Sequence, residues 1–220
     1  MIRAVTFDGH GVLYDRDRWV NDSIAEYLQQ YVKNIDQESI RKIYITCRDD
    51  SFKGVYRDRQ EMVDAFADKL GIKDLTLRRD LQKKVVEFSR NIKLFDGEIA
   101  VLKELKQSGY ILGMITNTFQ PAQEKINWFE QCGLPGIFDI VISSIEVGYR
   151  KPDSRIYQAF LDKTQLNAGE VVFIGHEQEE LDGAAKVGIG TIAFNCSPQT
   201  RANEFLIHYK DLPGMLMNWM

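Results

Sequence analysis

The sequence has few cysteines and no excess of basic residues, so it predicts neither a disulfide framework nor binding to nucleic acid or to an anionic membrane. Its three cysteines, Cys47, Cys132 and Cys196, are odd in number and far apart, so they predict neither a disulfide pattern nor a metal cluster. Acidic residues outnumber basic ones, 32 to 28, and the net charge of -4 argues against nucleic acid or an anionic membrane as partner. The expected partner is a small-molecule substrate, bound by a monomer or a homodimer.

Long apolar runs are also missing. No stretch is long enough to span a bilayer, and Asp8 interrupts the first apolar run too early for a signal peptide. Together with the scattered cysteines, this predicts a soluble, cytoplasmic protein. A hydrophobic content of 44% over 220 residues is still enough to bury a core, in one α/β domain with an insertion or in two small domains.

Strand and helix patterns alternate from about residue 95 onward. Apolar strands are expected over 110–115, 138–142, 171–174 and 191–194, with helices over 99–105, 122–132, 155–164 and 181–187. With a first strand near the N-terminus, this alternation predicts an α/β fold, a three-layer, doubly wound (Rossmann-like) parallel sheet. The apolar tail over 211–220 is expected to form a final helix on the sheet, with an exposed association patch as the alternative.

The segment between the first strand and this alternating region has helical periodicity. Apolar residues from Val20 to Val32 recur along one helical face, with Asn21 or Asp22 as the expected cap. Three further helices are expected, one starting near Gln37, one ending at Gly71 and one over 77–88. We therefore predict two domains: an α/β core over 1–15 and 94–220, and an inserted all-helical domain over 16–93.

Asp8 follows a short buried strand and precedes a sharp turn. The strand is Ala4-Val-Thr-Phe7, and Gly9 and Gly11 let the backbone turn. A carboxylate at the end of a parallel strand lies in the crevice where open α/β sheets bind ligands. On this segment alone, an ordinary turn-capping Asp is an equally good interpretation.

Three later segments complete a pattern with this one. A second strand ends in a hydroxyl and an amide, a Lys-Pro pair precedes a helix, and a third strand ends in a glycine and an acidic loop: Thr116-Asn117, Lys151-Pro152-Asp153 and Gly175 to Asp182. In this order and spacing, over nearly the whole chain, the four segments resemble the haloacid dehalogenase-like superfamily. That superfamily includes phosphatases, phosphomutases and dehalogenases, and its helical insert is a cap over the active site.

The resemblance implies a role for each residue. Asp8 is the nucleophile, which attacks phosphorus or a carbon that bears a halide. Thr116, with Asn117, donates hydrogen bonds to the reacting group, and Lys151 holds Asp8 and the substrate anion together. Taken singly, the last three have plainer interpretations as turn, helix-cap or solvated loop residues.

A magnesium site is also implied by the resemblance. Members of the superfamily hold Mg²⁺ with the first Asp, the backbone carbonyl two residues later and an acid of the last loop. Here these are Asp8, His10 and Glu180, with Glu177 as a rival ligand. The acids of this loop have a plainer interpretation as the negatively charged first turn of a helix.

Two positions depart from the phosphatase pattern. His10 and His176 stand where phosphatases carry acids. His10 can act as a general acid and base, or it can be an inert substitution. Imidazoles suit a transition metal better than Mg²⁺, so Mg²⁺, an altered metal site and no metal at all remain open.

Three functions therefore remain open. The leading hypothesis is a phosphatase that acts on a small phosphorylated metabolite through an aspartyl-phosphate on Asp8. The second is a metal-independent hydrolase of the dehalogenase type, favoured by the non-acidic His10 and by a last loop one residue shorter than in most phosphatases; Arg41 or Arg48 would then bind the halide. The third is a catalytically weak or inactive member that binds a ligand or a partner, because two of the usual acids are missing.

Overall fold

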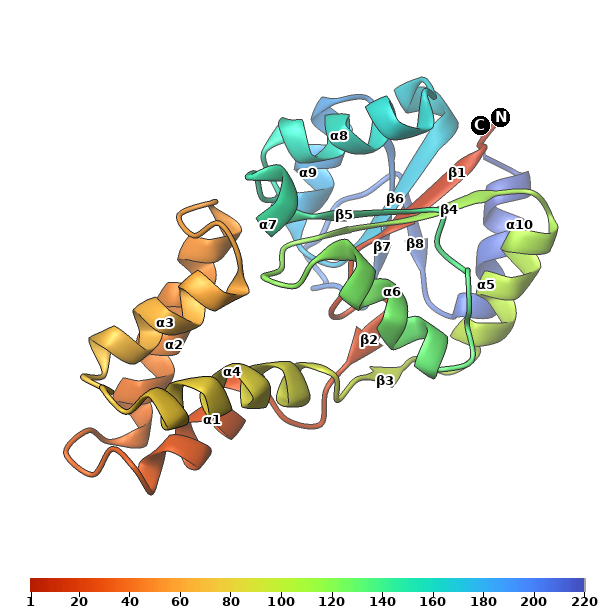
Figure 1. Cartoon of the computed structure of the whole chain (residues 1–220). Helices are drawn as coiled ribbons and strands as arrows, with labels where there is room; N and C mark the ends of the chain where they lie inside the picture. The colour runs from red at the N-terminus through yellow and green to blue at the C-terminus, as the bar shows by residue number, and fades with distance from the viewer. Residues whose placement is uncertain (220) are drawn as a thin grey trace.

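A six-stranded parallel sheet forms the centre of the computed structural model, which describes residues 1–219 (Figure 1). Its strands are β1 (Ala4–Phe7), β4 (Ile111–Thr116), β5 (Ile140–Ser143), β6 (Val171–Gly175), β7 (Gly190–Phe194) and β8 (Glu204–Leu206). They pair in the order β5-β4-β1-β6-β7-β8, and every neighbouring pair is parallel. The sheet thus grows outward from β1 in both directions, which confirms the predicted doubly wound α/β fold.

Helices cover both faces of the sheet (Figure 1). One face packs against α5 (Glu98–Gln107), α6 (Ala122–Gln131) and α10 (Leu212–Met217), and the other against α8 (Ser154–Thr164) and α9 (Gln178–Lys186). Side chains alternate along β1, because Val5 and Phe7 join the first cluster and Ala4 joins the second. The three predicted layers follow from this alternation.

The predicted helical insert is present and lies to one side of the sheet (Figure 1). It consists of α1 (Val20–Gln29), α2 (Gln37–Phe52), α3 (Arg59–Lys69) and α4 (Leu75–Ser89), which share a separate apolar cluster. Three of these helices begin after an aspartate whose side chain accepts a backbone N–H bond: Asp36, Asp58 and Asp74. All four helices fall within 16–93, while the division of the chain into two domains stays a prediction.

Several short elements have no counterpart in the sequence pattern. Two antiparallel strands, β2 (Tyr14–Asp15) and β3 (Lys93–Leu94), pair where the chain leaves the core and returns to it, and α7 (Ser144–Val147) follows β5. Elements this short carry no measurable periodicity. The predicted caps of α1 are also wrong, because the helix begins after Trp19, with no side-chain cap bond, and ends before Val32.

The C-terminal tail forms the predicted last helix. Leu212 and Leu216 of α10 are buried in the same cluster as the first face of the sheet. The final residue of that prediction, Met220, lies outside the described residues. Within residues 1–219, no helix combines the length and the hydropathy that crossing a bilayer requires.

Candidate active site

The predicted site residues meet at the carboxyl edge of the sheet. Asp8 directly follows β1, Thr116 ends the neighbouring strand β4, and Glu180 lies in α9, just after β6 on the other side of β1. Lys151 reaches the same point from the loop before α8. Parallel strands carry their ligand-binding loops at this edge, so the convergence follows from the topology.

Asp8 is a buried carboxylate in contact with the ammonium group of Lys151. The two residues are 5% and 2% exposed, and Lys151 Nζ donates a hydrogen bond to Asp8 Oδ1 and another, of 2.8 Å, to Glu180 Oε2. The backbone N–H of Gly9 also donates to Asp8 Oδ1, at 2.7 Å. Burial alone would raise the pKa of Asp8, but the charges of Lys151 and His176 outweigh it and lower the pKa to about 2. Asp8 is therefore ionised at neutral pH.

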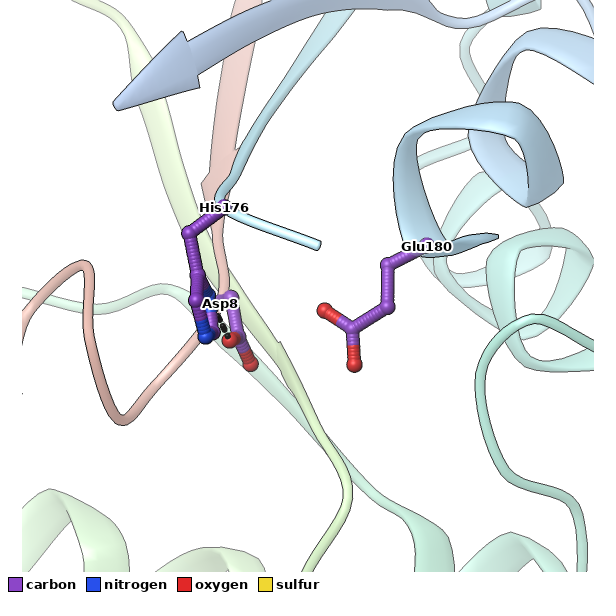
Figure 2. A group of neighbouring side chains, drawn as sticks. All are labelled: Asp8, His176 and Glu180. Atoms are coloured by element: carbon purple, nitrogen blue, oxygen red, sulfur yellow. Dashed lines mark ion pairs between the residues drawn. The ribbon is translucent and has the colours of Figure 1, made fainter. Parts of the chain in front are cut away.

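His176 contacts the other oxygen of this carboxylate (Figure 2). Its Nδ1 lies 3.2 Å from Asp8 Oδ2, at ion-pair distance, but it makes no hydrogen bond of good geometry within the described residues. Burial opposes the charged imidazole, yet the contact with Asp8 outweighs it and raises the pKa of His176. A Cβ atom at Gly11 would lie 3.0 Å from the His176 ring, and Gly11 has φ of +82°, so only glycine fits this turn.

Glu180 is a partly buried acid beside Asp8 and Lys151, and its pKa is raised close to neutrality. Burial and the charge of Asp8 raise its pKa to about 7, while Lys151 and His176 act against them. Its Oε1 lies 3.4 Å from Asn117 Nδ2, and its backbone carbonyl accepts a 2.6 Å bond from Tyr157. A carboxyl group with such a pKa can accept a proton near pH 7. We call Asp8, Lys151, His176 and Glu180 the reaction centre.

Thr116 and Asn117 occupy different positions relative to Asp8. Thr116 is 2% exposed, and its Oγ1 would lie 2.9 Å from a Cβ atom at Gly9, so the hydroxyl faces the backbone next to Asp8. Asn117 instead binds the backbone of Lys151 twice, accepting from its N–H at 2.8 Å and donating to its carbonyl at 3.2 Å. Asn117 therefore holds Lys151 in place, a role that strand-and-loop patterns alone do not predict.

The side chain of His10 contacts Asp15 and Trp19. Its Nε2 lies 3.2 Å from Asp15 Oδ1, and its ring centroid lies 4.6 Å from that of Trp19. Burial lowers the pKa of His10, so the neutral imidazole is favoured. The structure thus places the His10 imidazole against Asp15 and Trp19, at the start of the helical insert, while the metal ligand implied at this position is its backbone carbonyl.

The reaction centre brings together a group of side chains that could hold a metal ion. Ligand atoms of Asp8, His176 and Glu180 lie within 4.8 Å of one another, so a metal could meet two carboxylates and one imidazole there. Mg²⁺ prefers six oxygens, and the ammonium of Lys151 already contacts both carboxylates. Glu177, the rival ligand, is exposed and lies 3.4 Å from His176 Nε2. Lys151 thus supplies a positive charge to both carboxylates from within the chain.

A cavity of about 100 Å³ lies between the loop after β4 and the helical insert. His10 and Asn117 line it, together with Tyr14, Arg16 and Lys125. Sequence reasoning missed the last three. Lys125 lies in an amphipathic helix, where a lysine is ordinarily a solvated surface residue. The sequence feature that could have indicated its burial is its position three residues before Trp128, on the same helical face.

Comparison with known proteins identifies the family. A family model described as haloacid dehalogenase-like hydrolase matches residues 5–194. The chain belongs to this family. The superfamily and the hydrolase class predicted from the four motifs are thereby confirmed, and the type of hydrolase is left open.

Similarity in sequence to dehalogenases extends over nearly the whole chain, and to phosphatases over about half of it. Solved structures of both kinds, including a HAD phosphatase from Thermococcus onnurineus at a TM-score of 0.69 and 20% identity, cover 98% or more of this chain. The (S)-2-haloacid dehalogenase 4A of Burkholderia cepacia is 24% identical over 93% of this chain and 87% of its own length. The glyceraldehyde 3-phosphate phosphatase of Methanothermobacter thermautotrophicus is 33% identical, but over 46% of this chain and 44% of its own length. The crystal structure of a 2-haloacid dehalogenase from Pseudomonas syringae pv. tomato covers all of both chains, with a TM-score of 0.78 and 19% identity, which shows a shared fold.

Proposed function

We propose that this protein is a dehalogenase-type hydrolase, which replaces the halogen of a small 2-halo acid by a hydroxyl group. The proposal rests mainly on the pairing of Asp8 with Lys151 and His176. Asp8 is a buried, ionised carboxylate, and its countercharges come from side chains. The similarity to a 2-haloacid dehalogenase over 93% of the chain supports it further.

In the first step, a carboxylate oxygen of Asp8 attacks the carbon that bears the halogen. A carbon–oxygen bond forms, the carbon–halogen bond breaks, and the halide leaves with the bonding electron pair. The product is an ester between Asp8 and the acid. Lys151 and the Gly9 N–H hold Oδ1, which orients the carboxylate for this attack.

In the second step, water attacks the Cγ carbon of the Asp8 ester. Glu180, with its pKa raised to about 7, accepts a proton from that water. The ester bond breaks, the 2-hydroxy acid leaves with one proton of the water, and Asp8 is regenerated as a carboxylate. Net products are the hydroxy acid, a halide ion and a proton, which balances the reaction.

A phosphatase that forms an aspartyl-phosphate on Asp8 is the second candidate. Thr116, whose hydroxyl faces the backbone beside Asp8, favours it because a phosphoryl group needs such donors. The glyceraldehyde 3-phosphate phosphatase described above matches less than half of this chain in sequence, which supports the candidate for that part alone.

Two assays in parallel distinguish the candidates. We expect chloride release from (S)-2-chloropropanoate that persists with excess chelator, and weak hydrolysis of 4-nitrophenyl phosphate with Mg²⁺. Asp8→Asn should lower turnover by roughly 10⁴-fold, because an amide forms no ester, while Asp96→Asn on the surface should not. Magnesium-dependent phosphate release without chloride release would overturn the proposal in favour of the phosphatase.

A further inference from the structure

The cavity beside the reaction centre contains positive charge and no acid. Arg16, Arg48 and Lys125 line it, and its described lining includes neither Asp nor Glu. Arg48 is compensated by its neighbour Asp49, with N–O distances of 2.8 and 3.0 Å. We call the part around Tyr14, Arg16 and Lys125 the outer cavity.

Lys125 is a buried lysine whose charged form has no carboxylate partner among the described residues. It is 2% exposed, and within residues 1–219 its Nζ makes one hydrogen bond, of 2.7 Å, to the hydroxyl of Tyr14. The same Nζ lies 4.0 Å from the ring centroid of Trp128, a cation–π contact. Burial and the charge of Arg16 hold the pKa of Lys125 well below its usual range. Buried ammonium groups are ordinarily paired, so an anion in the cavity would supply what the fold leaves out.

Arg16 adds a second positive charge that no described carboxylate compensates. Its Nη1 donates to the backbone carbonyls of Asn91, at 3.0 Å, and Phe88, at 3.4 Å, and no described carboxylate lies at ion-pair distance from the guanidinium group. Its guanidinium carbon lies 5.3 Å from the ring centroid of Tyr14. A guanidinium stays charged in proteins, and its planar fork matches a carboxylate.

Tyr14 connects this charge to the reaction centre. Burial raises its pKa to about 12, so the hydroxyl stays protonated; since it accepts from Lys125, its own proton is free for an acceptor. A Cβ atom at Gly9 would lie 3.2 Å from this hydroxyl, so Tyr14 also faces the backbone next to Asp8. A ligand bound here would therefore lie next to the nucleophile.

We propose that Lys125, Arg16 and the Tyr14 hydroxyl form a carboxylate-binding subsite, which restricts the enzyme to small organic acids. The cavity of about 100 Å³ is small beside the roughly 300–1,000 Å³ of sites for drug-sized ligands. The inference rests on the proposed function only for the identity of the substrate group that reacts at Asp8, a halogen, and not for the carboxylate bound in the subsite. A phosphorylated acid would use the same subsite for its carboxylate.

Ligand binding without turnover tests the subsite by itself. Propanoate and its neutral analogue propanamide are titrated against the wild type, Lys125→Met and the surface control Lys163→Met, followed by ligand NMR. We expect Lys125→Met to weaken propanoate binding roughly tenfold to hundredfold and to leave propanamide unchanged, because a charge-assisted hydrogen bond is lost. Arg16→Gln should act in the same direction, and thermal unfolding of each variant checks its fold. Unchanged propanoate binding in folded Lys125→Met and Arg16→Gln would overturn the subsite.

Kinetics then separate the subsite from the proposed reaction. With (S)-2-chloropropanoate, Lys125→Met should raise KM roughly tenfold or more with little change in kcat, since the lost contact binds substrate and transition state alike. If the wild type releases no chloride but propanoate binding still depends on Lys125, the proposed reaction is wrong and the subsite stands. If chloride is released and KM is unaffected by Lys125→Met, the reaction stands and the subsite is wrong.

Discussion

The reaction centre and the outer cavity lie side by side, yet the fold compensates their charges in opposite ways. In the reaction centre, Lys151 contacts two carboxylates and His176 reaches the remaining oxygen of Asp8. In the outer cavity, Lys125 and Arg16 have backbone, hydroxyl and aromatic neighbours, and no described carboxylate.

In the reaction and subsite that we propose, this difference separates groups that perform chemistry from groups that select a ligand. A nucleophile held by fixed countercharges needs no rearrangement when the substrate arrives, and preorganisation of this kind lowers the barrier. A buried cation without a partner is unfavourable until an anion binds, so it favours ligands that carry the missing charge.

Glu98 shows a third way of treating a buried charge. This residue of α5 is fully buried, its Oε1 has no hydrogen-bond partner among the described residues, and its Oε2 accepts from the N–H of Phe95 at 3.0 Å. Burial raises its pKa to about 8, so at neutral pH the group is mostly protonated and uncharged. A buried group that has no countercharge and no route to a ligand is thus neutralised.

The largest effect is expected from removing the cation of the reaction centre. Lys151→Met leaves the carboxylates of Asp8 and Glu180 next to each other without a countercharge, which costs about 3–5 kcal/mol for a broken buried pair and raises the pKa of Asp8. We expect chloride release to fall by roughly a thousandfold or more. Lys163→Met, on the exposed side of α8, is the matched control. Near-normal turnover in Lys151→Met would show that the pairing is not needed for the chemistry.

A stability effect is expected from Glu98→Gln. The folded-state pKa of Glu98, about 8, lies above the ordinary value of 4.5, so the folded protein keeps a proton that the unfolded chain releases, and stability falls as pH rises between these values. The amide removes this loss, and the variant should be up to about 4 kcal/mol more stable near pH 8 and nearly unchanged near pH 4. Urea unfolding at both pH values measures the difference. Exposed Glu104→Gln should show no such pH-dependent gain.

The smallest of the three effects is expected from Glu180→Gln. Because the base must be deprotonated, wild-type turnover should rise with pH through about 7, the pKa of Glu180. The amide cannot accept the proton, so we expect turnover to fall roughly a hundredfold and this rise to disappear. A pH profile of chloride release, with the exposed neighbour Glu179→Gln as control, measures both. An unchanged profile in Glu180→Gln would assign the proton transfer to another group, with His176 the nearest.

Asp8 could be singled out from its own segment, while Lys151 and Glu180 are implied by the resemblance of four segments to the haloacid dehalogenase-like superfamily. Asp8 follows β1, Thr116 ends β4, Lys151 precedes α8 and Glu180 lies in the first turn of α9, and parallel topology brings such positions to one edge. The direction of the side chains could not be predicted. His10 and His176 both stand at positions of acids in related enzymes, but only His176 reaches Asp8.

What the sequence by itself determined is the layered core, the helical insert and the positions that carry chemistry, because periodicity and the ends of strands are local properties of the chain. Only the tertiary structure decided which charges are paired. From the sequence, Lys125 is expected on the solvated face of an amphipathic helix. It is buried instead, because α6 packs it against Tyr14, which lies more than one hundred residues earlier in the chain. Contacts of that kind depend on packing between distant segments, and they determine the charges and pKa values of both the reaction centre and the outer cavity.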